Sequence, residues 1–345
     1  TNPPIGTDSI PASDVVGYAY RNGHFVAKYW KNGVATDLSD GTTNVKAYSI
    51  SISNNDVFIC GEYNDPNTYF NAPKLWKNGS EIALSVVYPG AGVDKNNRGY
   101  AKSIAAYNGN SYTAGYVTDG GGSFSVAALW VNGGLPTLLC PRLDQDLKNG
   151  DSYAEAVFVA DNGDVYVAGE QHMGSGLGNK QIVMWKNGVK TQLTNYTLDV
   201  NGFPGQVTSM FVSGADVYIT CSYMPEESGV SKQKVAYFKN GVLHIVSDAS
   251  LGAYAHSIYV KNNDVYVVGF NGSSSTPLLW KNDVLTNLST IKYGGTVRSV
   301  FVKNTDVYAC GESDNKAKAT IWKNNKIYAL TDGTDYNTAT DLVIR

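Results

Sequence analysis

Short runs of β-branched and aromatic residues recur along the chain, and turn residues separate them. One example is Val165-Tyr166-Val167, which follows Asn162-Gly163. Such runs are typical of strands, and Asn-Gly or Asn-Asn pairs supply the positive backbone angles of a two-residue hairpin. Both faces of the predicted strands carry apolar or small residues, whereas an antiparallel sheet usually keeps one solvated face. The pattern therefore predicts sheets packed between neighbouring sheets, as in propeller blades.

The run Leu75-Trp76-Lys77-Asn78-Gly79 belongs to a motif that occurs seven times. All six tryptophans of the chain lie in this motif, and Phe238 replaces the seventh. The copies begin at Tyr29, Leu75, Leu129, Met184, Tyr237, Leu279 and Ile321. Repeats spaced by 42 to 55 residues indicate a propeller or a solenoid.

Two further motifs precede most of the tryptophan runs, so that each repeat contains four predicted strands. Strand A resembles Ala47-Tyr48-Ser49-Ile50, and strand B resembles Asp56-Val57-Phe58-Ile59. Strand C carries the tryptophan, and strand D follows the Asn-Gly pair, as in Val284-Leu285-Thr286-Asn287-Leu288. We expect tight hairpins between A and B and between C and D.

The two chain ends predict how the repeats close. The first predicted strand, Asp14-Val15-Val16-Gly17, has the pattern of strand B and lacks a strand A. Residues 339–345 form a strand A without a following strand B. Pairing these ends would leave no exposed edge, whereas a solenoid would have atypical capping repeats. We therefore predict an all-β, seven-bladed β-propeller with four antiparallel strands per blade and velcro-type closure. It would span residues 13–345 as a single domain, after a linker at 1–12.

The motif order resembles the HAF-type repeats of bacterial extracellular propeller proteins. The segments Val165 to Gly169 and Trp185 to Gly188 carry the resemblance well, and it extends from about Asp14 to Arg345. The His-Ala-Phe core of the family is missing, and only its alanine is kept, at Ala27, Ala72, Ala128, Ala236 and Ala319. The resemblance implies a propeller fold and an exported protein, and it implies no particular activity.

Composition narrows the possible setting and partners. Charged residues make up 17% of the chain, below the roughly 25% of ordinary soluble domains, and the net charge is −3. No basic stretch could bind a nucleic-acid backbone, and no run of 18 apolar residues could form a membrane-spanning helix. The chain begins without Met, as a processed end would. We expect a secreted or cell-surface monomer. Whether a removed N-terminal segment anchors it is an open alternative.

Cysteine and histidine positions do not predict a metal or a cofactor. Cys60, Cys221 and Cys310 lie in predicted strands and are expected to be buried apolar side chains. No Cys-x-x-Cys pair occurs, and the four histidines lack metal-ligand spacing. The acidic loops near Asp94 and Asp144 have the wrong pattern for calcium.

Binding is expected at the top face, where the B–C and D–A loops lie. These loops are long and unequal, whereas the hairpins of the opposite face are short and uniform, and function tends to concentrate on variable loops. The longest are Tyr63 to Asn71, Ser85 to Arg98, Val117 to Ser125, Gln171 to Lys180 and Tyr223 to Lys234.

The second position of strand A should place one side chain of each blade at the upper mouth of the channel. These residues are Tyr48, Lys102, Glu155, Thr208, His256, Arg298 and Thr340. Neighbouring candidates are the tyrosines just before this position and the acids just after strand B: Tyr100, Tyr153, Tyr254, Glu62, Glu170 and Glu312. Aromatic faces beside planar hydrogen-bonding groups suit sugars or peptides. Arg298 would bind an anion, and His256 would strengthen binding on protonation below about pH 6.5.

Three functions are compatible with this pattern. The first is an exported, non-catalytic binding module or scaffold that recognises a glycan or a protein on its top face. The alternative is a polysaccharide-active enzyme, a lyase or a hydrolase, with Tyr, His or Glu as base and Arg298 holding a carboxylate. The third is a structural spacer, with a merely solvated channel in which Arg298 pairs with Glu312 or another local acid. No Gly-x-Ser-x-Gly motif or phosphate-binding loop occurs, and a fold alone cannot decide between these functions.

Overall fold

The computed structural model describes residues 9–64, 71–87, 98–118, 124–140, 150–172, 180–194, 206–223, 233–247, 251–288, 294–313 and 318–345. Within these residues the chain forms 28 strands and no helix. The strands make seven four-stranded antiparallel sheets, which we call blades 1 to 7. The predicted fold class is confirmed.

The blades follow one another in chain order, and the strands of each blade run from the inner to the outer edge in the order given. Blade 1 contains β28 (Tyr336–Ile344), β1 (Ser13–Arg21), β2 (His24–Lys31) and β3 (Val34–Asp37). Blade 2 contains β4 (Asn44–Ser53), β5 (Asp56–Asn64), β6 (Asn71–Lys77) and β7 (Ser80–Ala83). Blade 3 contains β8 (Gly99–Tyr107), β9 (Asn110–Thr118), β10 (Ser125–Val131) and β11 (Thr137–Leu138). Blade 4 contains β12 (Ser152–Val159), β13 (Val165–His172), β14 (Lys180–Lys186) and β15 (Val189–Gln192).

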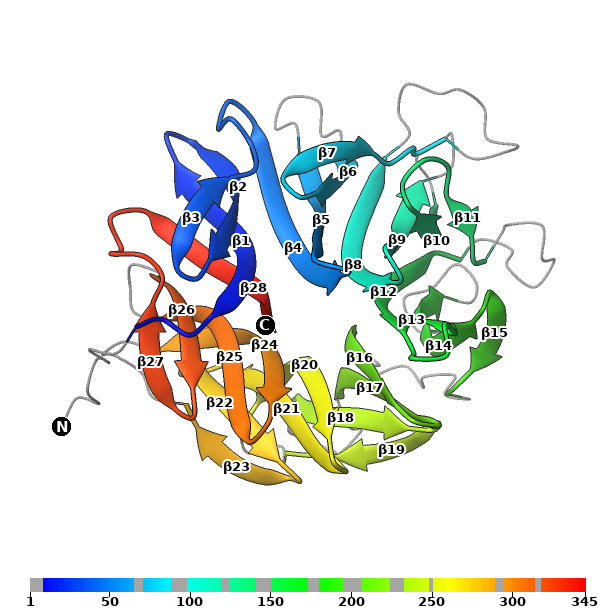
Figure 1. The fold of residues 1–345 in the computed structure, drawn as a ribbon. Helices are drawn as coiled ribbons and strands as arrows, with labels where there is room; N and C mark the ends of the chain where they lie inside the picture. The colour runs from blue at the N-terminus through cyan, green and yellow to red at the C-terminus, as the bar shows by residue number, and fades with distance from the viewer. Residues whose placement is uncertain are drawn as a thin grey trace.

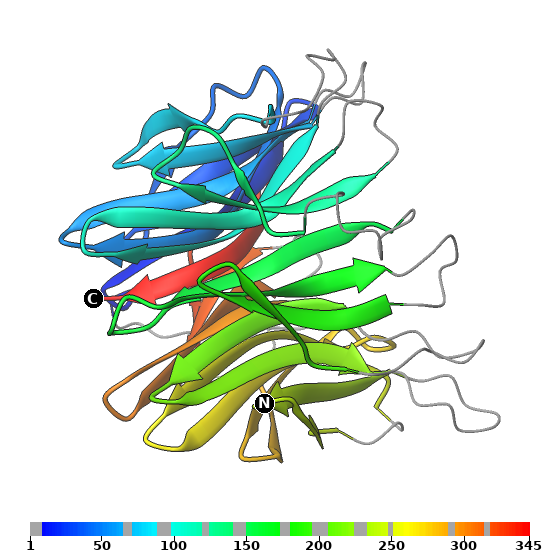
Figure 2. The same cartoon turned by 90° about the vertical axis from the view of Figure 1, so that its right-hand side faces the viewer.

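The remaining three blades repeat this arrangement. Blade 5 contains β16 (Val207–Ser213), β17 (Asp216–Tyr223), β18 (Lys234–Lys239) and β19 (Val242–Ile245). Blade 6 contains β20 (Ala253–Lys261), β21 (Asp264–Asn271), β22 (Thr276–Lys281) and β23 (Val284–Asn287). Blade 7 contains β24 (Gly295–Lys303), β25 (Asp306–Ser313), β26 (Lys318–Lys323) and β27 (Lys326–Ala329). The first strand of each blade faces the central axis of the ring (Figure 1), and a side view shows the blades standing side by side around it (Figure 2).

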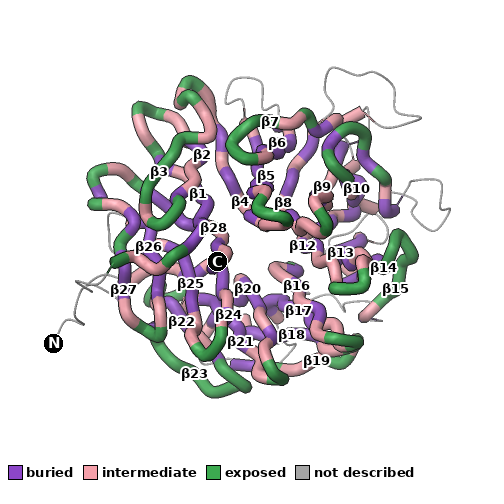
Figure 3. Tube along the Cα trace, in the orientation of Figure 1, coloured by how far each residue is buried: buried purple, intermediate pink, exposed green. Residues whose placement is uncertain are grey.

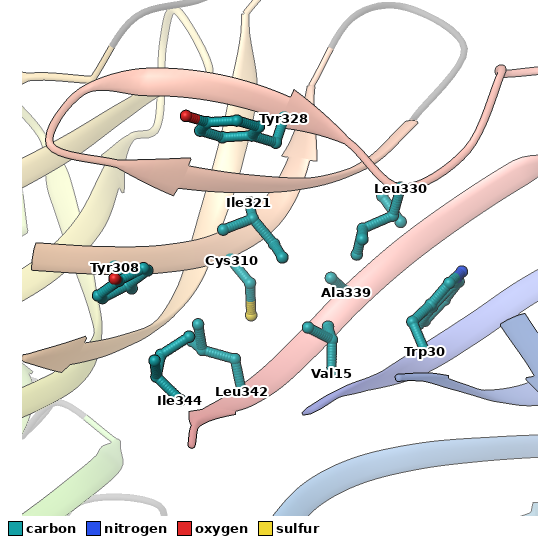
Figure 4. Packing of buried hydrophobic residues seen from close by; sticks show 11 residues of the cluster. Val15, Trp30, Tyr308, Cys310, Ile321, Tyr328, Leu330, Ala339, Leu342 and Ile344 are labelled. Carbon is teal, nitrogen blue, oxygen red and sulfur yellow. The ribbon is translucent and has the colours of Figure 1, made fainter. Parts of the chain in front are cut away.

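Blade 1 closes the ring by joining the two ends of the described chain. β28 pairs antiparallel with β1, and Ser13 lies opposite Ile344. Leu342 and Ile344 pack with Val15 and Trp30 against blade 7 (Figure 4). The Arg345 guanidinium contacts the buried Asp14 carboxylate, with 2.5 Å between Nε and Oδ2. The predicted closure is therefore present, and it combines backbone pairing, apolar packing and an ion pair.

The apolar core lies between the blades. Among the described residues, buried side chains form seven clusters, and each contains one of the seven motif aromatics. Trp185 of blade 4, for example, packs on Ala114 and Ala127 of blade 3, and its indole N–H donates to the Leu139 carbonyl at 2.8 Å. Both faces of the inner three strands are thus covered, while outer strands such as β3, β15 and β23 are exposed (Figure 3). This packing explains why the sequence pattern places apolar or small residues on both faces of the predicted strands.

The Lys and Asn of the repeated motif connect the two hairpins of a blade through an ion pair and hydrogen bonds. In blade 4, the Lys186 ammonium lies 2.8 Å from Asp164, and the Asn187 amide also donates to Asp164 at 2.8 Å. The Asn187 side-chain oxygen accepts the backbone N–H of Val165 at 2.9 Å. Blades 2, 5, 6 and 7 repeat this arrangement with Asp56, Asp216, Asp264 and Asp306. The arrangement links strand B to the C–D hairpin and accounts for the spacing of the motif.

Most hairpins have the predicted two-residue turns with two positive φ angles, such as 51° and 67° at Asn54 and Asn55. Two expectations were wrong. Asn162-Gly163 belongs to a three-residue loop, because the Gly163 N–H donates to Ala160 and the Ala160 N–H donates to Asp164. Asn132-Gly133 opens a longer connection, in which Gly134 exchanges backbone hydrogen bonds with Ala83 and Ser85 of blade 2. The hairpin face is therefore less uniform than predicted.

Candidate functional site

Every inner strand carries a β-bulge at the second position of its motif. In blade 4, Ala154 lies opposite Gly169 and Ala156 lies opposite Ala168, so Glu155 has no partner on strand B. The residues skipped in this way are Tyr48, Lys102, Glu155, Thr208, His256, Arg298 and Thr340. Bulges of this kind bend a strand and redirect a side chain. Each blade therefore has one inner-strand residue, at the same position of the repeat, that is not paired with strand B.

A glycine at the end of strand B makes room for the bulge in six blades. A Cβ added to Gly169 would lie 1.9 Å from the Tyr153 carbonyl oxygen, far inside a contact distance. The equivalent glycines are Gly17, Gly61, Gly115, Gly269 and Gly311. In blade 5 the position is Cys221, and β16 begins only at Val207, its partner. The Cys221 side chain is accommodated because Gln206, the equivalent of Tyr153 in blade 4, is not part of the paired strand.

We expect Gly169→Ala to destabilise the protein by about 1–3 kcal/mol, because strand β12 must move away from the added methyl group. Thermal or urea unfolding measures this cost. Cys221→Ala is the matched control, since this position already has a Cβ, and it should change stability much less. Equal destabilisation by the two substitutions would contradict the proposed role of the glycine.

The bulges bring the seven skipped side chains together around one cavity of about 220 Å³ at the axis. The next residue of each inner strand also lines it, and five of these are serines: Ser49, Ser103, Ser209, Ser257 and Ser299. All seven residues expected at the channel mouth line this cavity: Tyr48, Lys102, Glu155, Thr208, His256, Arg298 and Thr340. The wall therefore consists largely of hydroxyl, charged and imidazole groups.

Asp341, which sequence reasoning missed, takes the place of a serine in blade 1. Its carboxylate accepts hydrogen bonds from the hydroxyls of Ser49 and Ser299 at 2.9 and 2.7 Å. It also accepts the backbone N–H groups of Ile50 and Leu342 at 3.0 and 2.9 Å. Burial raises the pKa of Asp341, and these hydrogen bonds oppose the shift. Asp341 therefore joins blades 1, 2 and 7 at the axis, and the only signal in the sequence is an Asp at a serine position.

Arg298 and His256 occupy neighbouring positions on one side of the cavity. The Arg298 guanidinium lies 3.4 Å from the Glu312 carboxylate, and its buried Nε has no hydrogen-bond partner among the described residues. His256 Nδ1 lies 2.6 Å from the Val297 carbonyl, which places the proton on Nδ1 and leaves Nε2 as an acceptor. Arg298 therefore has the Glu312 partner foreseen by the spacer hypothesis, and its unpaired Nε is enclosed by the protein rather than open to a ligand.

The expected protonation of His256 near pH 6.5 is wrong. Burial, and after it the Arg298 charge, lower the pKa of His256 to about 4. The imidazole is therefore neutral at pH 6 to 8. It can accept a hydrogen bond, but it adds no positive charge on mild acidification.

Lys102 and Glu155 face the cavity from blades 3 and 4. The Lys102 ammonium lies 5.7, 5.4 and 5.8 Å from the ring centres of Tyr48, Tyr100 and Tyr116. Within the described residues, no carboxylate lies within ion-pair distance of it. Burial raises the pKa of Glu155 to about 7, the Lys102 charge opposes this shift, and the Glu170 charge adds to it. Glu155 is thus an acid that changes its charge near neutral pH.

The other candidates lie beside the cavity rather than in its wall. Tyr100 stacks on Tyr116 at 4.5 Å, Tyr153 contacts Tyr116 edge to face at 4.8 Å, and Tyr254 stacks on Phe270 at 5.1 Å. The three acids are bound by neighbouring groups. Glu62 accepts the Tyr48 hydroxyl, Glu170 pairs with Lys180 and accepts the Val207 N–H, and Glu312 accepts the Thr296 and Thr338 hydroxyls.

The sequence also predicted functional loops, no metal site and no membrane-spanning helix, and these predictions fall only partly within the described residues. The central parts of the five long top loops lie outside the described residues. Across the described ranges, no group of three or more His, Cys, Asp or Glu side chains is arranged to hold a metal, and no helix could span a membrane. Cys60, Cys221 and Cys310 are buried, as predicted.

No family model matches the chain, and no curated protein matches its sequence. The fold is similar to that of the polysaccharide lyase Uly1, with a TM-score of 0.56 and 12% identity over 96% of this chain and 92% of that one. It is also similar to a puromycin-hydrolysing peptidase from Mycobacterium tuberculosis, with a TM-score of 0.54 and 8% identity over 96% of this chain and 56% of that one. An α-L-arabinofuranosidase from Clostridium thermocellum gives a TM-score of 0.38 at 13% identity, over 72% of this chain and 94% of that one. At these identities the first two similarities show the propeller fold alone.

Proposed function

We propose that the protein is an exported binding module for an anionic glycan, which it holds at the axial cavity. The observation that carries the proposal is the placement of two cationic side chains on separate sides of one polar cavity. Arg298 comes from blade 7 and Lys102 from blade 3, and both line the cavity. A planar guanidinium suits a carboxylate or a sulfate group.

Aromatic rings beside the cavity favour a sugar over a simple anion. The Tyr100–Tyr116 pair flanks it at blade 3, and the Tyr254–Phe270 pair flanks it at blade 6. Tyr254 is 37% exposed, so its ring is accessible to a ligand. Aromatic side chains with a polar end commonly contact ligands through their faces. The known substrate class of the similarly folded Uly1, a polysaccharide, agrees with this choice at the level of the fold.

The cellular setting is part of the proposal. The HAF-type repeat pattern and the low charge content support a secreted or cell-surface protein, acting as a monomer. The propeller would then serve as a rigid frame whose axial residues select the glycan.

We expect Arg298→Ala to reduce binding of an acidic oligosaccharide at least tenfold, since it removes a charge-assisted pair worth about 1.5–3 kcal/mol. A glycan array with matched acidic and neutral oligosaccharides identifies the probe, and calorimetry gives its affinity. Thr208→Ala, two blades away in blade 5, is the control for a small change in the cavity wall. An unchanged affinity of Arg298→Ala, at an unchanged melting temperature, would place the binding site elsewhere.

A polysaccharide-active enzyme is the second candidate, and Glu155 is the observation in its favour. A carboxyl group with a pKa of about 7 in a cavity can act as a general acid or base at neutral pH. Asp341 is a poor second carboxylate for hydrolysis, because both of its oxygens already accept hydrogen bonds. A lyase would therefore fit better than a hydrolase. Incubation with acidic polysaccharides, followed by assays for unsaturated products and for reducing ends, distinguishes an enzyme from a binding module.

A further inference from the structure

We propose that Glu155 binds the anionic group of the glycan in its protonated form, donating a hydrogen bond beside Lys102, so that binding takes up a proton. This inference rests on the proposed function and adds a binding residue and a proton to it. It also reassigns the pH response that the sequence suggested for His256.

The arrangement of Lys102 and Glu155 supports a shared anion site. Both are skipped bulge residues, on the neighbouring inner strands β8 and β12, and both line the cavity. The Lys102 ammonium lies over three tyrosine rings in cation–π contacts, and it forms no ion pair with a described carboxylate. An anion that enters between these two side chains would meet the ammonium on one side and the Glu155 carboxyl on the other.

The groups around Glu155 determine its charge. Lys102 on β8 and Lys180 on β14 favour the carboxylate, and Gln206, just before β16, favours it through a hydrogen bond. Glu170 on β13 disfavours the carboxylate, and so does burial, which is the largest influence. Tyr116 on β9 also lies close enough to feel the Glu155 charge. Lys180 is already paired with Glu170, and no described cation lies within ion-pair distance of the Glu155 carboxyl group.

The direction of the pH effect follows from these influences. Below about pH 7 the carboxyl is mostly protonated and can donate to an anion. Above that pH it is a carboxylate, which repels the anion at close range. If only the protonated form binds, affinity should fall about tenfold between pH 6 and pH 8, with uptake of about half a proton per ligand at pH 7.

The test uses calorimetric titration with two acidic probes, trigalacturonate and a hyaluronan tetrasaccharide, at pH 6, 7 and 8. At pH 7 the titration is repeated in HEPES and in Tris, whose different ionisation enthalpies reveal the number of protons taken up. Wild type should show the pH dependence and the proton uptake. Glu155→Gln keeps a donor without a titrating group, so it should bind with an affinity that is nearly independent of pH and without uptake. His256→Asn should retain the pH dependence.

The possible failures are distinct. If neither probe binds wild type at any of these pH values, both the proposed function and this inference are overturned. If a probe binds without proton uptake, or if Glu155→Gln keeps the pH dependence while His256→Asn loses it, only the inference is overturned. The melting temperature of each variant confirms that the changes in binding do not arise from unfolding.

Discussion

A chain that lacks Asn337–Arg345 is expected to unfold or aggregate at temperatures where the full chain is stable. The deletion removes almost all of β28, the inner strand of blade 1, and leaves β1 with an unpaired edge. It also exposes the partners of Leu342 and Ile344, each of which contributes about 1.5–3 kcal/mol by burial. The buried Asp14 would lose Arg345, leaving a desolvated carboxylate without its cation. Circular dichroism and thermal scans measure the loss.

Adding the missing strand as a separate peptide provides the control. A peptide of residues 337–345 should restore folding in a concentration-dependent way, because it can pair with β1 in the native register. A peptide with Leu342 and Ile344 changed to Asp should not rescue. A truncated protein that is soluble and melts like the full chain would show that the β1–β28 pairing is not required for closure.

Trp185→Ala is expected to cost about 3–5 kcal/mol, as large core truncations do. Trp185 is fully buried between blades 3 and 4, and the substitution leaves both a cavity and an unpaired Leu139 carbonyl. Urea unfolding gives the change in the free energy of unfolding. A stability close to that of wild type would mean that this position faces solvent and that the role assigned to the motif tryptophans is wrong.

Phenylalanine is the matched replacement, because Phe238 occupies the equivalent position in blade 5 and lies in the same kind of cluster. Trp185→Phe should therefore cost clearly less than Trp185→Ala, since most of the apolar volume remains. The reverse substitution, Phe238→Trp, tests whether the cluster between blades 4 and 5 has adapted to the smaller ring.

The fold could be predicted from the sequence because each blade repeats the same local chemistry. Pairs such as Asn54-Asn55 determine the turn geometry, and Trp76 marks the strand that packs against the preceding blade. The prediction was wrong where the same residue pair occurs in a different local context. Asn162-Gly163 looks like the other turns, yet the longer connection to Asp164 forms a three-residue loop.

The site could be predicted less well, because its chemistry depends on contacts between blades. The repeat predicts the seven positions around the axis, and the repeated glycine of strand B, opposite the residue before each of them, is a further signal for the bulge. No local pattern reveals that Asp341 accepts hydrogen bonds from two other blades. Nor does the sequence near His256 show that burial beside Arg298 keeps the imidazole neutral. Charge states inside the ring depend on residues that are far apart in the chain.

The bulge separates the residues whose backbone pairing forms the ring from those whose side chains determine the chemistry of the cavity. The seven skipped residues include an aromatic ring, an ammonium, a carboxyl, an imidazole, a guanidinium and two hydroxyls, while the surrounding backbone repeats from blade to blade. Thr340 is an exception, because its hydroxyl also donates to the Val16 and Ala47 carbonyls of blades 1 and 2. Exchanging the other six side chains, singly or together, would change what the cavity prefers while the repeated backbone is kept. The protein therefore offers six nearby positions at which combinatorial substitution could select a new specificity.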